Sequence, residues 1–110
     1  MHQKQLIMLI ELGETNKLTD LLCKNNLDLE QKDSDGNTPL NIAVQNGNYE
    51  IVLTLIKQGA SIDTQNNLGN TPLHFANTYN FPNVLKLLIN NGKMNLDKFI
   101  VYRSQPEDTK

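Results

Sequence analysis

GNTPLNIA at residues 36–43 returns as GNTPLHFA at residues 69–76, exactly one period of 33 residues later. Six of the eight positions carry the same residue in both copies. The correspondence continues into a second apolar pattern that ends in glycine both times: Ile51, Leu55, Ile56 and Gly59 match Val84, Leu88, Ile89 and Gly92. A fixed period of this length is typical of stacked-repeat proteins.

The retained residues predict a unit made of two helices. Gly36 allows the positive φ of a tight turn. Thr38 can cap a helix N-terminus, and Pro39 fits the first helical position, where its missing N–H is no loss. Gly47 is placed to end that helix, and Asn80, which also tolerates the left-handed conformation, takes its place in the next copy. A second helix follows at apolar 3.6-residue spacing, so the predicted unit is turn, helix, turn, helix and return.

GNTPLHFA is similar to the Thr-Pro-Leu-His-x-Ala signature of the ankyrin repeat, and the period matches that family. The resemblance covers roughly residues 3–97. It implies an all-α, ankyrin-repeat solenoid of about three stacked helix-turn-helix units, with short β-hairpin loops along one edge. The predicted layout is one domain at 1–102, with units at about 1–32, 33–65 and 66–98 and then a C-terminal cap segment, followed by a flexible tail at 103–110.

The two ends of the chain depart from the repeat. In the first unit Gln5 and Leu6 are expected at the Thr-Pro places. The run LIMLI at 6–10 cannot face one neighbour on a 3.6-residue period. FIVY at 99–102 is β-prone and lies where a fourth unit would begin. We expect it to fold back as a cap over the third unit, with contact to another chain as the alternative.

Composition narrows the classes of function. Net charge is -2, charged residues make up 20% of the chain, and the basic residues are scattered. Nucleic-acid binding needs a basic stripe, so none is expected. No apolar run is long enough to span a membrane, residues 1–15 do not resemble a signal peptide, and a single cysteine allows no internal disulfide. The predicted location is cytoplasmic, with no membrane partner.

Residues 33–37 resemble the start of a calcium loop, because Asp33, Asp35 and Asn37 alternate. The glycine and the final glutamate of such a loop are missing from their places. In the second copy the two acids become Asn66 and Leu68. We therefore interpret the acids as variable surface and predict no metal site.

Two further side chains could suggest catalysis. The resemblance implies that His74 is a structural histidine that hydrogen-bonds between neighbouring loops, with Asn41 in that place one unit earlier. Cys23 falls at the position of Ile56 and Ile89, so it is expected in the core. Neither a nucleophile motif nor a phosphate-binding glycine loop is found. We predict no catalytic residue and no cofactor.

The resemblance implies a non-catalytic protein-protein interaction module, an adaptor or scaffold. In the family, partners contact the hairpin tips and the exposed side of each first helix. The corresponding positions here are Lys32, Ser34, Asp35, Asn37, Gln45 and Asn46 in the middle unit, and Gln65, Asn67, Leu68, Asn70, Thr78 and Tyr79 in the third.

Leu68 and Tyr79 stand out among these positions. Leu68 is apolar at a loop tip, where it either meets a partner or lies flat on its own hairpin. Tyr79 is of a residue type enriched at interface hot spots, but it could instead pack under Phe81. The alternative function is a structural subunit that self-associates, as a homodimer, through its apolar terminal repeats.

Overall fold

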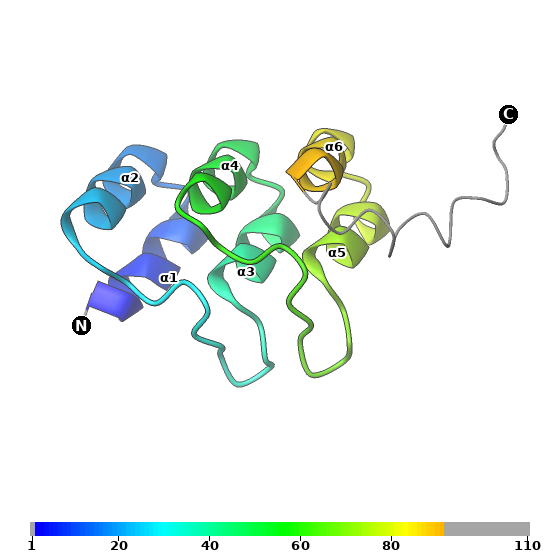
Figure 1. The fold of residues 1–110 in the computed structure, drawn as a ribbon, viewed down its shortest axis with the longest axis horizontal. Coiled ribbons are helices and arrows are strands. Elements are labelled where there is room, and N and C mark those ends of the chain that lie inside the picture. The colour runs from blue at the N-terminus through cyan, green and yellow to red at the C-terminus, as the bar shows by residue number, and fades with distance from the viewer. Residues whose placement is uncertain (1, 92–110) are drawn as a thin grey trace, which may run out of the picture.

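The computed structural model describes residues 2–91, which form three pairs of helices set side by side (Figure 1). The first helices of the pairs form one row and the second helices form another. The six elements are α1 (His2–Leu12), α2 (Thr15–Lys24), α3 (Pro39–Asn46), α4 (Tyr49–Lys57), α5 (Pro72–Thr78) and α6 (Pro82–Asn91). This arrangement confirms the all-α repeat solenoid.

The helix ends follow the repeated residues. Thr38 precedes α3 in an extended conformation and its side chain accepts a hydrogen bond from the N–H of Asn41, with Pro39 at the first turn. Thr71 caps α5 in the same way. Gly47 ends α3 at φ 69°, and Asn80 has φ 60° after α5. The caps predicted from the sequence are confirmed.

The core lies between the two helix rows. Fully buried aliphatic side chains from both rows meet there, and they recur at equivalent places in successive units: Leu6, Leu18, Leu40, Ile51, Leu55, Val84 and Leu88. Each helix therefore covers the apolar face of its pair mate and of its neighbour in the row. This mutual burial is what holds a repeat stack together.

The first unit has a different register from the one predicted. Corresponding N–H groups bond to the carbonyls of Leu9, Ala43 and Ala76 after the three first helices, so α1 and α3 are 34 residues apart and α3 and α5 are 33 apart. Leu6 is therefore equivalent to Leu40, and both are fully buried. The placement of Gln5 and Leu6 at the Thr-Pro positions is wrong by one residue, because the turn after α1 carries one extra residue.

Cys23 is exposed, so its predicted place in the core is wrong. The equivalent Ile56 and Ile89 are only half-buried, which puts this position at the margin of the helix contact. A short cysteine side chain reaches less of the core from there than isoleucine does. The FIVY segment, Gly92 and the tail from residue 103 lie outside the described residues.

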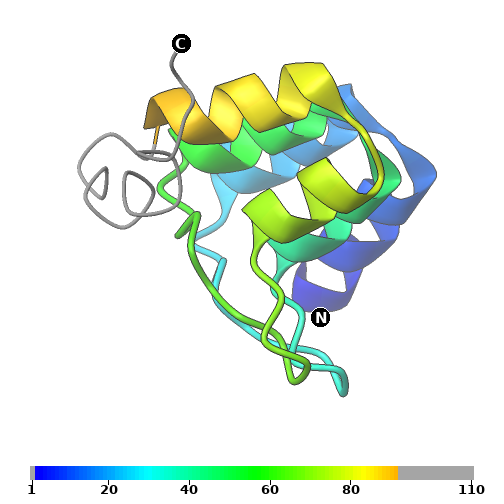
Figure 2. The same ribbon diagram turned by 90° about the vertical axis from the view of Figure 1, so that its right-hand side faces the viewer.

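Two loops project past the row of first helices on the same side, as Figure 2 shows. No strand is assigned within residues 2–91, so the predicted β-hairpins are hairpin turns without regular strands. Each turn is closed locally: the N–H of Asp33 donates to Asn37 O at 3.0 Å, and that of Asn66 to Asn70 O at 2.9 Å. Further bonds run to the neighbouring turn rather than along paired strands.

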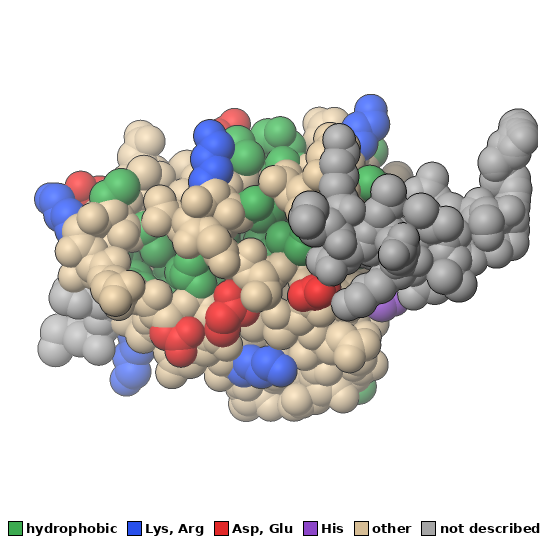
Figure 3. All heavy atoms as spheres, viewed as in Figure 1, with side chains coloured by type: hydrophobic (Ala, Val, Ile, Leu, Met, Phe, Trp, Pro, Cys, Tyr) green, Lys and Arg blue, Asp and Glu red, His purple; other side chains and the backbone are tan. Residues whose placement is uncertain are grey.

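The connecting segments that lead into these turns are also tied together. The Glu30 carboxylate accepts from the N–H of Ser61 at 2.9 Å. At the N-terminal end, the Gln3 side chain accepts from the N–H of Asp28 and donates to its carbonyl. Acidic side chains lie along these segments, and hydrophobic ones show between them and the second helix row (Figure 3).

Candidate functional site

Each hairpin tip is organised by one side-chain oxygen. Asp33 Oδ1 accepts from the N–H groups of Asp35 and Asn37, both at 2.9 Å. Asn66 Oδ1 accepts from Leu68 at 2.9 Å and from Asn70 at 3.0 Å. Aspartate and asparagine offer the same acceptor here. The interpretation of Asp33 as variable surface is therefore wrong, because its role is kept in the second copy by Asn66.

The two tips are bonded to each other. The N–H of Asn67 donates to Asp35 O at 2.9 Å, and Asn67 Nδ2 donates to Ser34 O at 3.0 Å. Lys32 Nζ lies 3.3 Å from Gln65 O and donates to it. Four residues apart in their own hairpins, these contacts span the whole junction. The tips thus form one continuous edge with a fixed spacing.

Asn37 belongs to this junction rather than to the open surface. Only 9% of the residue is exposed, and its Oδ1 accepts from Asn66 Nδ2 at 3.0 Å. A partner could reach it only by opening the hairpin contact. We therefore place Asn37 in the scaffold beneath the predicted contact surface.

The remaining predicted positions are open to different degrees. Gln45 and Asn70 are half-buried. The others are exposed along the tips and the first helices: Lys32, Ser34, Asp35, Asn46, Gln65, Asn67, Leu68, Thr78 and Tyr79. The structure therefore brings the loop positions of both units onto one edge, and sets the helix positions of α3 and α5 beside it.

Leu68 is the most open apolar side chain on this edge, with 85% of its surface exposed. It does not lie flat on its own hairpin. Tyr79 is 50% exposed, and its ring centroid lies 6.1 Å from those of both Phe75 and Phe81. One side of the tyrosine is thus packed while the rest is open, so both readings of this residue hold in part.

His74 acts within its own unit. Its Nδ1 accepts from the N–H of Thr71 at 2.9 Å, while Thr71 Oγ1 accepts from the N–H of His74, so the two residues cap α5 reciprocally. The bond between loops predicted for this position is made one unit earlier, where Asn41 Nδ2 donates to Thr64 O at 3.4 Å. The corresponding loop after His74 lies outside the described residues.

The chemistry of the described surface gives little support to catalysis. Within residues 2–91, no three His, Cys, Asp or Glu side chains are grouped in a way that could hold a metal ion. Asp33 Oδ1 is already engaged by two backbone N–H groups. The part of the chain that the structure describes also has no helix that is long and apolar enough to cross a membrane.

Some contributors to the site were missed at the level of sequence. The pairing of Asn67 with the preceding hairpin joins residues 32 or 33 positions apart, and no local pattern marks it. The double hydrogen bond of Gln3 to Asp28 has no counterpart in the repeat signature. The change of Asp33 to Asn66 was the one available signal, since both side chains keep a carbonyl-type oxygen.

Comparison with known proteins agrees with this architecture. A family profile described as "Ankyrin repeats (3 copies)" matches residues 6–99. A transient receptor potential cation channel subfamily A member 1 homolog of Caenorhabditis elegans is 40% identical over 61% of this chain and 6% of its own length. B-cell lymphoma 3 protein of Homo sapiens is 44% identical over 54% of this chain and 14% of its own length.

A third relative matches more of the chain: the potassium channel SKOR of Arabidopsis thaliana is 30% identical over 87% of it, and over 12% of the channel. The chain thus spans only a small part of each of these relatives. What they share with it is the stack of helix pairs and hairpin turns. This chain belongs to the ankyrin-repeat family.

Proposed function

We propose that this chain is a non-catalytic adaptor that binds another protein through its hairpin edge and the adjoining faces of α3 and α5. Ankyrin repeats in general mediate protein-protein interaction. The observation that carries the proposal is the bonded junction of the two tips, which holds Leu68 in solvent at 85% exposure. A rigid edge loses little conformational entropy on binding, so its exposed side chains can contribute to affinity.

Tyr79 is the proposed anchor beside that edge. Its packing against Phe75 and Phe81 limits the rotamers of the ring, and half of the residue is open to a partner. Tyrosine in such a setting offers apolar contact area and a hydroxyl at small entropic cost. The exposed amides and hydroxyls nearby can supply hydrogen bonds at the rim: Ser34, Asn46, Gln65, Asn67 and Thr78.

Site-specific photo-crosslinking tests the assignment. A photoreactive phenylalanine analogue at Leu68 should capture a partner from the source lysate, and the same analogue at Lys57, exposed at the end of α4, is the matched control. We expect Leu68→Asp and Tyr79→Ala each to weaken the captured partner by about 1 kcal/mol or more. Equal capture from both positions, or unchanged affinity in both variants, would refute the proposed edge.

Self-association is the second candidate function, and one observation favours it. Met8 and Leu12 on α1 are 51% and 66% exposed, so the N-terminal end of the stack carries open apolar surface. Sedimentation velocity over a range of concentrations separates the two functions. A chain that stays monomeric and still binds its partner supports the adaptor, while a tight dimer supports the structural subunit.

A further inference from the structure

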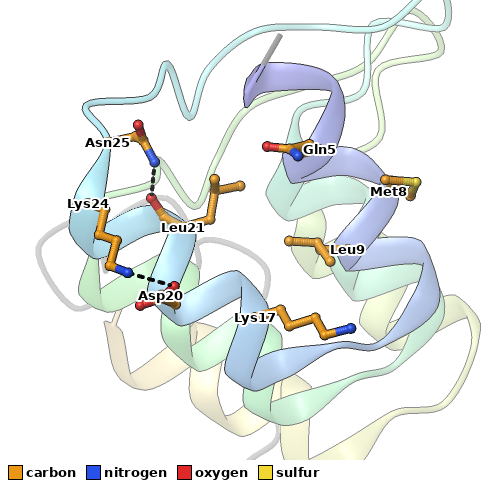
Figure 4. Close-up of a pocket in the computed structure, with 8 residues that line it drawn as sticks. All are labelled: Gln5, Met8, Leu9, Lys17, Asp20, Leu21, Lys24 and Asn25. Atoms are coloured by element: carbon orange, nitrogen blue, oxygen red, sulfur yellow. Dashed lines mark hydrogen bonds and ion pairs between the residues drawn. The ribbon is translucent and has the colours of Figure 1, made fainter.

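The outer face of the first helix pair holds a pocket of about 260 Å³ (Figure 4). Its floor and walls come from both helices, with Gln5, Met8 and Leu9 on α1 and Leu21 on α2. Lys17 and Asp20 lie at its rim. This face is on the side of α1 and α2 that points away from the rest of the stack, and it takes no part in the hairpin edge described above.

Repeat equivalence identifies what this face is shaped for. The equivalents of Gln5 are Pro39 and Pro72, and both prolines are buried, whereas Gln5 is exposed. The equivalents of Leu9 are Ala43 and Ala76, which are fully buried, whereas Leu9 is half-buried. These positions are covered only in the units that have a unit before them.

The α2 wall of the pocket follows the same rule. Lys17, Asp20 and Leu21 are equivalent, 66 residues on, to Asn83, Lys86 and Leu87 of α6. Those three residues line a site together with Tyr49 of the preceding unit, and Leu87 is buried. The pocket on α1 and α2 is therefore the place where each later unit receives the helix pair before it.

A second copy of this chain is a poor occupant, because the other end of the stack is polar at the decisive position. Ile10 and its equivalent Val44 are buried by the unit that follows each of them. The third residue of this series is Asn77, which is exposed. Burying its amide against an apolar pocket without a hydrogen-bond partner would cost free energy.

We propose that the outer face of α1–α2 is a second docking site, which takes a helix pair of a different protein chain in the register of a preceding repeat. The partner carries aliphatic side chains at the two positions that correspond to Leu40 and Val44. Met8 and Leu9 pack between them. This site is independent of the hairpin edge, so the chain can join two partners at once.

The test uses a probe made from this chain, with its own pocket blocked and its far end made apolar: the Met8→Glu/Asn77→Val double variant. Mixed with the wild-type chain, it should form a saturable 1:1 complex by isothermal titration calorimetry and sedimentation velocity. The Met8→Glu single variant, which keeps Asn77, is the matched control probe and should not bind. Circular dichroism establishes that both probes are folded.

The pocket itself is tested on the wild-type side of the complex. Met8→Glu should weaken binding of the double-variant probe at least about tenfold. Leu12→Glu changes an equally open apolar residue of α1 that does not line the pocket, and should leave binding within about twofold. No complex with the folded probe at hundreds of micromolar, or equal binding of both probes, overturns the proposal. Dimerisation of the wild type alone that Met8→Glu abolishes overturns the choice of partner.

Discussion

Gly36 and Gly69 form a natural pair for testing how the hairpin junction contributes to stability. They occupy the same turn position in successive units, at φ 80° and 83°. A Cβ at Gly36 would clash with Asn67 of the next hairpin, whose backbone N would lie only 2.8 Å away. A Cβ at Gly69 would meet no described atom within 4 Å. Alanine at the two sites thus shares the backbone strain but not the clash.

The magnitudes follow from these geometries. Alanine in the left-handed region costs about 1–2 kcal/mol, and this applies to both variants. At Gly36 the next hairpin must also move, which disturbs the two bonds from Asn67 to Ser34 and Asp35. Each such bond contributes about 1 kcal/mol net. We expect Gly36→Ala to destabilise the fold by about 2–4 kcal/mol and Gly69→Ala by about 1–2 kcal/mol.

Urea unfolding followed by far-ultraviolet circular dichroism measures both free energies. The slope of the transition must match that of the wild type for the comparison to hold. The melting temperatures should then differ by roughly 4 °C or more. Equal loss in the two variants, or a larger loss at Gly69, would show that the contact between hairpins does not stabilise the stack.

The remaining predictions concern the scaffold and one surface position. Asp33→Ala should lose about 1–3 kcal/mol of unfolding free energy because two backbone N–H groups lose their acceptor, while Asp33→Asn should stay near wild type; urea titration distinguishes them. Gly47→Ala should destabilise more than Gly13→Ala in thermal melts, because a Cβ at Gly47 comes within 2.7 Å of an aromatic ring and one at Gly13 only within 3.4 Å of an amide. Cys23 should react with a maleimide in the folded protein as fast as a free thiol; slow reaction that speeds up in urea would contradict its exposure.

The parts of the fold that the sequence predicts correctly are those written in short-range patterns. The Thr-Pro caps of α3 and α5 and the left-handed residues after them depend on neighbours within one turn. They recur at a fixed spacing, so each copy supports the other. The first unit lacks this signature, and its register was therefore wrong by one residue.

The parts that could not be predicted depend on contacts between units. Asn37 looks like a loop residue in its own hairpin, but the side chain of Asn66 covers it from the next one. Cys23 looks like a core residue by alignment, yet its position is at the margin of the helix contact. The candidate edge could be located from the resemblance, and Leu68 and Tyr79 could be singled out by residue type. Their surroundings required the three-dimensional arrangement.

The bonds across the hairpin junction have one more consequence, for how binding specificity can change. Their acceptors at Ser34, Asp35 and Gln65 are main-chain carbonyls, which every amino acid possesses. The side chains at these three places can therefore be exchanged while the acceptors stay where they are. Mutation can alter what the edge recognises without first weakening the frame that displays it, so new specificities are accessible in single steps.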